Sequence, residues 1–224
     1  VEVFDSIQPD IIINCVGITK REINTNNILE TITINSQLPH RLAKWTKENN
    51  KKLIHLSTDC VFDGKIGNYN EESLTTAEDM YGRTKALGEV KSSNTLVIRA
   101  SFIGLELFSK TELLEWFLSK ENKTIKGFTN TMYSGGSTIY LSKIVKEIII
   151  NHQNLFGLYQ LAPIDSISKY DLLFLAKKYF KVNIKIIPDD KQIHKPTLDA
   201  SKLTKRIGLK VPSWDSMMNQ LAKE

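Results

Sequence analysis

Three residues in the first half of the chain carry side chains that could protonate a carbonyl oxygen. Thr58 supplies a hydroxyl, Tyr81 a phenol and Lys85 an ammonium group. A Tyr and a Lys four residues apart lie on one face of a helix, so the ammonium can favour the ionised form of the phenol. Together these groups predict reductase chemistry. Because the Tyr-x-x-x-Lys spacing alone is a weak motif, the prediction depends on the elements that position it.

Strand and helix signals alternate through this half. Short apolar runs predict strands at residues 10–15, 52–56 and 95–100, and helices are expected at residues 31–48 and 81–90. Continuous apolar runs are typical of strands buried on both faces of a parallel sheet. The repeated strand-helix-strand order therefore predicts an α/β fold with a parallel, doubly wound sheet.

The second half is more helical. An apolar face predicts a helix that begins near Ile139, and Ser168 is suited to cap another. Strands are expected at residues 157–161 and 184–187, and Pro188 follows the second of them. The tail contains two candidate short helices, at residues 198–207 and 213–221.

Composition limits the class of protein. The chain has 224 residues with 41% hydrophobic content and no apolar run long enough to cross a bilayer, so we expect a soluble globular protein without a membrane partner. The net charge of +5 comes from scattered lysines, so we expect no nucleic-acid partner. A positive surface also suits a phosphorylated or nucleotide-linked substrate.

The cysteines and histidines predict neither disulfides nor metal. Cys15 and Cys60 lie in or beside apolar strands and are too few for a disulfide framework, so we expect reduced, buried thiols and a cytoplasmic protein. The four histidines lack the spacing of metal ligands. We therefore expect no metal site.

Five segments, in this order, resemble the markers of extended short-chain dehydrogenase/reductases. The segments are INCVGIT at residues 13–19, Asn35, LSTDCVFDG at residues 56–64, YGRTK at residues 81–85 and IRAS at residues 98–101. Within that family the chain most resembles the dTDP-4-dehydrorhamnose reductases and related NDP-sugar reductases, over essentially its whole length. The resemblance implies an NAD(P)-binding Rossmann-like sheet with a small C-terminal α/β substrate-binding part.

The division that this resemblance implies has two parts. Residues 1–104 would form a partial Rossmann dinucleotide-binding domain with the catalytic residues. Residues 105–224 would complete the Rossmann core and form the smaller substrate-binding lobe. A homodimer is among the assemblies that the family allows.

The implied function is NAD(P)H-dependent reduction of an NDP-4-keto-6-deoxysugar in surface polysaccharide biosynthesis. Tyr81 would deliver a proton to the 4-keto oxygen, and Thr58 would hydrogen-bond to the same oxygen. Lys85 would lower the pKa of the phenol and bind the nicotinamide ribose. The alternative is an ordinary exposed helix pair and a turn residue.

The resemblance extends these roles to the residues around them. The expected cofactor contacts, to NADPH or NADH, are Cys15, Val16, Gly17, Asn35, Ser57, Tyr81, Lys85, Ala100, Ser101 and Ile103. The expected substrate contacts are Thr58, Asp59, Val61, Phe62, Tyr81 and Ser137.

Several of these residues also have simpler explanations. Gly17 could serve only a strand-to-loop turn, Asn35 could be a surface residue, and Ser137 could only cap a helix. Arg99 and Trp116 could contact a phosphate or a base, or could have core or strand-end roles.

One family marker is missing from the sequence. Relatives begin with a strand and a Gly-x-x-Gly-x-x-Gly turn that holds the cofactor pyrophosphate, and this chain contains no such turn. On the usual size of βαβ units, we expect roughly the first 60 residues of the family's fold to be absent from this chain. We therefore expect the strand at residues 10–15 to be an unprotected sheet edge and this polypeptide to bind dinucleotide weakly or not at all, whereas its full-length parent should bind it.

Two other functions stay open. An NDP-sugar epimerase or dehydratase has the same fold, but no extra Asp-Glu acid/base pair lies between Thr58 and Tyr81. A non-catalytic nucleotide-binding regulatory subunit is favoured by the missing glycine turn. The intact Thr58, Tyr81 and Lys85 argue against it.

Overall fold

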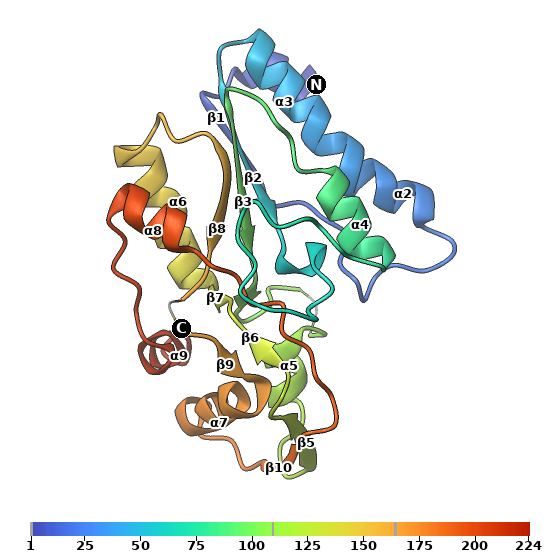
Figure 1. The fold of residues 1–224 in the computed structure, drawn as a ribbon, viewed down its shortest axis with the longest axis vertical. Coiled ribbons are helices and arrows are strands. Elements are labelled where there is room, and N and C mark those ends of the chain that lie inside the picture. The colour runs from blue at the N-terminus through green and yellow to red at the C-terminus, as the bar shows by residue number, and fades with distance from the viewer. Residues whose placement is uncertain (1, 109, 164) are drawn as a thin grey trace. The chain divides into compact units, whose positions relative to one another are not determined.

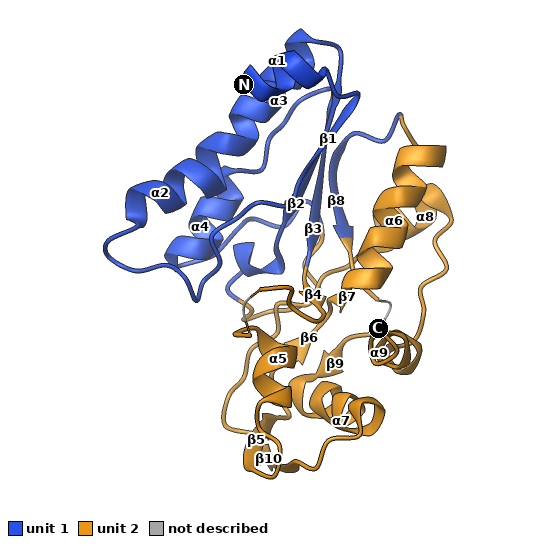
Figure 2. Ribbon diagram, turned by 180° about the vertical axis from the view of Figure 1, so that it is seen from behind, with its two compact units in different colours: residues 1–63, 71–100, 154–160 blue, residues 64–70, 101–153, 161–224 orange. Residues whose placement is uncertain are grey.

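The computed structural model describes residues 2–108, 110–163 and 165–224. The chain forms two compact units, which Figure 2 shows in blue and orange. Unit 1 comprises residues 1–63, 71–100 and 154–160, and unit 2 comprises residues 64–70, 101–153 and 161–224. Each unit therefore contains chain segments that are distant in sequence, so neither corresponds to one contiguous half of the chain.

Unit 1 contains a sheet with the strand order β1-β2-β3-β8 (Figure 1). The strands are β1 Ile11–Asn14, β2 Lys52–Ser57, β3 Thr95–Ala100 and β8 Gly157–Leu161. β1 pairs in parallel with β2, and β2 pairs in parallel with β3. β2 and β3 are buried along their whole length, as their continuous apolar runs predict. The predicted parallel sheet is confirmed, and β1 lies at its edge as expected.

The helices of unit 1 lie together on one face of this sheet (Figure 2). They are α1 Glu2–Ile7, α2 Ile28–Ile32, α3 Leu38–Glu48 and α4 Met80–Leu87, with a π-helical turn η1 at Thr33–Gln37 and a 3-10 turn η2 at Asp59–Val61. Leu42 and Trp45 of α3 pack with Ile12 and Leu53 of the sheet. This core holds α3 against the strands.

Two helix boundaries of unit 1 differ from the sequence prediction by three residues, and in unit 2 the helix expected at residues 198–207 begins at Ser201. The helix expected at residues 31–48 begins at Ile28, and η1 interrupts its regular spacing. The pattern of apolar residues assumes 3.6 residues per turn throughout and does not register a π-turn. The helix expected to reach residue 90 ends at Leu87, because Gly88 closes it.

Unit 2 combines helices with three two-stranded sheets, which pair β5 with β10, β4 with β7 and β6 with β9. Its strands are β4 Phe102–Ile103, β5 Thr124–Phe128, β6 Met132–Tyr133, β7 Gly136–Ser137, β9 Ile167–Ser168 and β10 Lys185–Asp189. Its helices are α5 Leu113–Leu118, α6 Thr138–Asn151, α7 Lys169–Phe180, α8 Ser201–Ile207 and α9 Trp214–Leu221. Phe117, Leu172, Ile184 and Met218 lie in its core.

Local signals predict most of unit 2 but not its strand pairing. Ser168 caps α7 by accepting a hydrogen bond from the Asp171 amide, as expected. Pro188 lies inside β10 instead of following it. β10 belongs to a two-stranded sheet, where a proline without an N–H is tolerated at the edge. β5, its parallel partner, was not predicted because the pairing is distant in sequence.

Three further features concern the described residues. No helix there is long and apolar enough to cross a membrane. The same residues contain no group of three or more His, Cys, Asp or Glu side chains that could hold a metal ion. Both cysteines are free, but Cys15 is exposed and Cys60 is half-buried, so the prediction of buried thiols is wrong for Cys15. Cys15 directly follows the edge strand β1, where few neighbours cover it.

Candidate active site

Thr58 lies where β2 turns into η2. Its backbone is extended, and its hydroxyl accepts a hydrogen bond from the Cys60 amide at 3.1 Å, which caps the 3-10 turn. The same hydroxyl donates to the Asp59 carboxylate at 3.2 Å. Asp59, Val61 and Phe62 are buried with it. The Ser-Thr-Asp run therefore forms a compact turn at the carboxyl end of a central strand, where parallel sheets bind ligands.

Tyr81 and Lys85 lie on α4, which contacts the turn η2 that follows Thr58. Asp79 caps α4 by accepting a hydrogen bond from the Gly82 amide at 2.9 Å. Tyr81 is half-buried in the first turn, and Lys85 follows one turn later with 4% exposure. The Lys85 ammonium donates to the Leu56 carbonyl of β2 at 2.8 Å. The interpretation of Tyr81 and Lys85 as an exposed pair is therefore wrong for Lys85.

Lys85 is an ammonium group in a dry environment. Burial lowers its pKa to about 8, while the negative charge of Glu89 acts in the opposite direction. At neutral pH the side chain is therefore still charged. The Leu56 carbonyl uses one of the three N–H donors of the Lys85 ammonium. Within the described part of the chain, Lys85 therefore has donors left for further acceptors, such as ligand hydroxyls.

A buried ion pair borders Lys85. The Arg99 guanidinium donates to both carboxylate oxygens of Glu89, at 2.8 and 2.7 Å, and the Ser57 hydroxyl donates to one of them at 2.7 Å. Arg99 also lies 5.0 Å above the centre of the Phe62 ring. These contacts favour the core role for Arg99. In unit 2, Trp116 packs against that unit's core, which favours the same conclusion.

Two asparagines shape the loop that follows β1. Asn14 accepts a hydrogen bond from the Val16 amide at 3.2 Å, and Asn35 accepts one from the Ile18 amide at 2.8 Å and donates to the Ile18 carbonyl at 2.9 Å. Asn35 is fully buried, so the interpretation of it as a surface residue is wrong. The loop around Gly17 is thereby fixed beside Lys85. A Cβ atom on Gly17 would lie 3.8 Å from the Lys85 nitrogen.

His55 supports this arrangement from inside the sheet, although no motif in the sequence pointed to it. The Nδ1 atom of His55 lies 3.0 Å from the side-chain amide nitrogen of Asn14, and His55 is fully buried. Burial and the nearby Lys85 charge lower the pKa of His55 to about 3. Its ring is therefore neutral at physiological pH.

The other predicted residues follow the division into units. Ala100, at the end of β3, is buried in unit 1. Ser101, Ile103 and Ser137 belong to unit 2, where the paired strands β4 and β7 bring Ile103 and Ser137 together. Ser137 caps α6 by accepting a hydrogen bond from the Tyr140 amide at 3.1 Å, so its capping role is confirmed.

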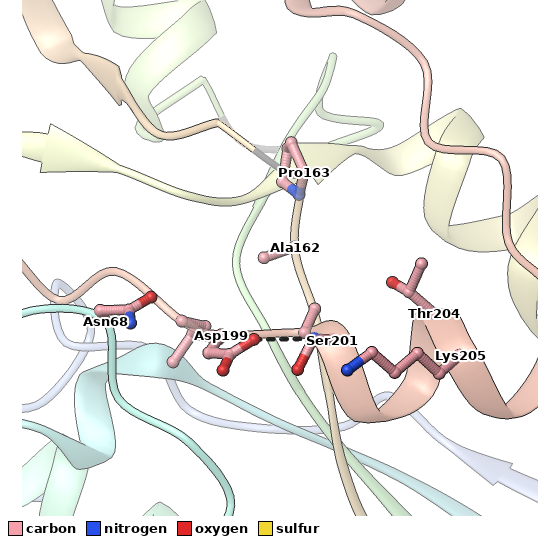
Figure 3. A pocket seen from close by; sticks show the side chains of 9 residues that line it. Asn68, Ala162, Pro163, Asp199, Ser201, Thr204 and Lys205 are labelled. Carbon is pink, nitrogen blue, oxygen red and sulfur yellow. Dashed lines mark hydrogen bonds between the residues drawn. The ribbon is translucent and has the colours of Figure 1, made fainter.

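Unit 2 also contains a cavity of about 200 Å³ (Figure 3). Asp199 lies on its wall and accepts a hydrogen bond from the Ser201 amide at 2.9 Å. Thr204 and Lys205 of α8 face it as well. None of the residues predicted from the sequence lines this cavity.

The residues of unit 1 fit the nicotinamide end of a dinucleotide. Lys85 offers a charged donor beside the loop at Gly17, which has no side chain there, and Tyr81, one helical turn before Lys85, carries a phenol. The pyrophosphate end is different, because these 224 residues contain no Gly-x-x-Gly-x-x-Gly turn to bind it.

Comparison with known proteins identifies relatives of the whole chain. The model of the RmlD substrate binding domain matches residues 1–224. A dTDP-4-dehydrorhamnose reductase of Aggregatibacter actinomycetemcomitans is 26% identical over 247 residues, which cover 98% of this chain and 82% of that protein. A probable low-salt glycan biosynthesis reductase of Haloferax volcanii is 34% identical over 108 residues, which cover 46% of this chain and 36% of that protein.

Solved structures of similar reductases share the fold of this chain. The crystal structure of dTDP-4-dehydrorhamnose reductase from Bacillus anthracis in complex with NADP has a TM-score of 0.85 and 21% sequence identity, and the match covers 98% of this chain and 82% of that one. At this identity the structural likeness establishes the fold alone. The family match along the whole length establishes more: the chain belongs to the RmlD substrate-binding-domain family.

Proposed function

We propose that the chain carries the reaction residues of an NADPH-dependent reductase of dTDP-4-keto-6-deoxysugars, in the synthesis of a surface polysaccharide, with cofactor binding impaired because these 224 residues contain no Gly-x-x-Gly-x-x-Gly turn. The observation that carries the proposal is the buried Lys85 ammonium, one helical turn after Tyr81 on a helix that contacts the Thr58 turn. A lysine is rarely buried without a reason, because removing its charge from water is costly. The names of the family relatives supply the substrate class.

Each side chain has a separate role in this proposal. Tyr81 donates its phenolic proton to the oxygen of the 4-keto group, and the Thr58 hydroxyl donates a hydrogen bond to the same oxygen. Both groups stabilise the negative charge that develops there. Lys85 favours the phenolate that remains on Tyr81 after the proton has left. When bound, the nicotinamide cofactor supplies the hydride.

Charge and cysteine chemistry support two further parts of the proposal. The substrate is an anionic nucleotide-sugar, which suits a chain with a net charge of +5. The two free cysteines suit a reducing, cytoplasmic setting.

The test is the oxidation of NADPH in the presence of dTDP-4-dehydrorhamnose, with NADPH concentrations high enough to offset the weak cofactor binding expected of this chain. The Tyr81→Phe variant removes only the phenolic oxygen and should lower kcat by about 10³-fold, since general acids typically contribute 10² to 10⁴. Tyr170→Phe is the matched control, because Tyr170 lies on α7 of unit 2 and its ring contact with Phe174 would be kept. Unchanged turnover in Tyr81→Phe would exclude Tyr81 as the proton donor.

A further inference from the structure

The first turn of α4 approaches the Thr58 turn more closely than any side chain would allow. A Cβ atom built on Gly82 would lie 2.1 Å from the Cys60 carbonyl oxygen and 2.4 Å from the Ala77 Cβ atom. The backbone of Gly82 has ordinary helical geometry, so the glycine is required by space and not by an unusual φ. The helix that carries Tyr81 therefore rests directly on the backbone that follows Thr58.

The other end of α4 makes a contact of the same kind. A Cβ atom on Gly88 would lie 2.2 Å from the Asn35 carbonyl oxygen, on the π-helical turn η1. Two hydrogen bonds reinforce this contact. Ser36 donates to the Thr84 carbonyl at 2.8 Å, and the Asn35 amide donates to the Thr84 hydroxyl at 3.3 Å.

The two contacts lie beside different functional groups. Gly82 follows Tyr81 directly, and its partner Cys60 is two residues after Thr58. Gly88 is three residues after Lys85, and its partner Asn35 holds the loop at Ile18. Inside a helix glycine is a poorer helix former than alanine, so Gly82 carries a cost that its close contact explains.

We propose that Gly82 and Gly88 are positioning residues for the reaction. Gly82 sets the distance between Tyr81 and Thr58, and Gly88 sets the position of Lys85 relative to the cofactor loop at residues 15–18. The assignment of these two effects to proton transfer and to cofactor binding rests on the function proposed above.

Hydrogen exchange of two amides tests the contacts without reference to the reaction. The Cys60 amide bonds to Thr58 and the Ile18 amide bonds to Asn35. Gly82→Ala should speed exchange at Cys60 by about 10-fold or more and change Ile18 little, and Gly88→Ala should do the reverse. Leu87→Ala is the control on the same helix, because Leu87 is 67% exposed. Equal effects on both amides in each variant, or effects no larger than in Leu87→Ala, would overturn the proposal.

Kinetics test the functional half. At saturating NADPH, Gly82→Ala should lower kcat by about 100-fold with a small change in the KM for NADPH, since misplacement by about 1 Å has that cost. Gly88→Ala should mainly raise the KM for NADPH, by about 10-fold. The same loss of both parameters in both variants would contradict separate positioning roles.

The two kinds of failure can be told apart. If the unsubstituted chain binds NADPH in calorimetry but does not reduce the sugar, the proposed function fails, and the exchange pattern still decides whether the glycines position α4. If Gly82→Ala does not fold, Gly88→Ala decides through its effects on Ile18 and Cys60.

Discussion

The two units place their charged groups in opposite ways. Unit 1 contains 11 Lys and Arg against 13 Asp and Glu, a net charge of −2, and unit 2 contains 19 against 12, a net charge of +7, which together give the +5 of the chain. Yet, in the described part of the chain, the buried Lys, Arg, His and acidic side chains belong to unit 1. They are Lys52, His55, Asp59, Lys85 and Arg99. In the described residues of unit 2, the buried polar side chains are hydroxyls only.

This difference separates two uses of charge. A buried charge is costly and holds a fixed geometry, which is what a proton-transfer site needs. An exposed charge keeps its hydration and so has little desolvation cost. Its field extends about 10 Å at moderate salt, which suits attraction of an anionic substrate. The buried charges of unit 1 therefore suit the reaction site proposed above, and the net positive charge of unit 2 suits attraction of the proposed anionic substrate.

The largest expected effect is the response of unit 1 to acid through His55. Its folded pKa of about 3 is below its ordinary 6.5, so between pH 6.5 and pH 3 the unfolded state takes up a proton that the folded state does not. Stability therefore falls as the pH falls through this window, by about 1.4 kcal/mol per pH unit and at most about 5 kcal/mol.

Urea unfolding of the wild type and of His55→Gln at pH 7, 6, 5 and 4 measures how much His55 contributes to the loss of unfolding free energy in acid. The wild type should lose stability relative to the variant as the pH falls. His152→Gln is the control, since His152 is partly exposed at the end of α6. Parallel curves for the wild type and His55→Gln would show that the burial of His55 does not govern acid stability.

The second effect is the response of unit 1 to base through Lys85. Its folded pKa of about 8 is below its ordinary 10.5, so the unfolded state binds more protons between these values. The cost of the buried ammonium is present below pH 8 and disappears as the pH rises to 10.5, so this group adds about 3 kcal/mol of stability across the window.

Unfolding of the wild type and of Lys85→Met between pH 7.5 and pH 10 checks this prediction. The wild type should gain stability relative to the variant over that range. Lys44→Met provides the comparison with an exposed lysine of the same unit, since Lys44 lies in an exposed pair with Glu48. A constant difference between wild type and Lys85→Met would contradict a depressed pKa.

Elements that depend on local sequence were predicted, whereas burial that depends on distant segments was not. The strand at residues 95–100 and the capping residues Ser137 and Ser168 follow local rules, and the structure confirms them. His55 gave no signal, because its burial depends on strands β1 and β3 on either side of it.

Contacts between distant segments explain the other failures. The π-turn at Thr33–Gln37 and the glycine contacts of α4 depend on pairs such as Asn35 with Thr84, which are 49 residues apart. A pattern of apolar residues records the period of an element and not its partner.

The smallest expected effect concerns the charge of unit 2. Changing Lys195, Lys202 and Lys205 to Gln should lower kcat/KM for the nucleotide-sugar by about 3- to 10-fold at low salt, because the field that attracts an anion is weakened. About 0.5 M salt should remove the difference by screening.

A triple Lys-to-Gln variant of unit 1 is the control for the triple variant of unit 2. Lys44, Lys47 and Lys91 changed to Gln alter the net charge by the same amount, and they should reduce kcat/KM less. Equal losses for the two triple variants would show that only the total charge matters.

The central claim is that this chain adds a hydride to the 4-keto carbon while Tyr81 protonates the oxygen. NADPH deuterated at the reactive position of the nicotinamide, supplied in large excess because this chain is expected to bind it weakly, is incubated with dTDP-4-dehydrorhamnose and the protein, and the mass and NMR spectra of the product test the claim. The account predicts deuterium at C4 of the sugar with the wild type and about 10³-fold less in the same time with Tyr81→Phe. A product without deuterium at C4, or equal labelling by the two proteins, would contradict it.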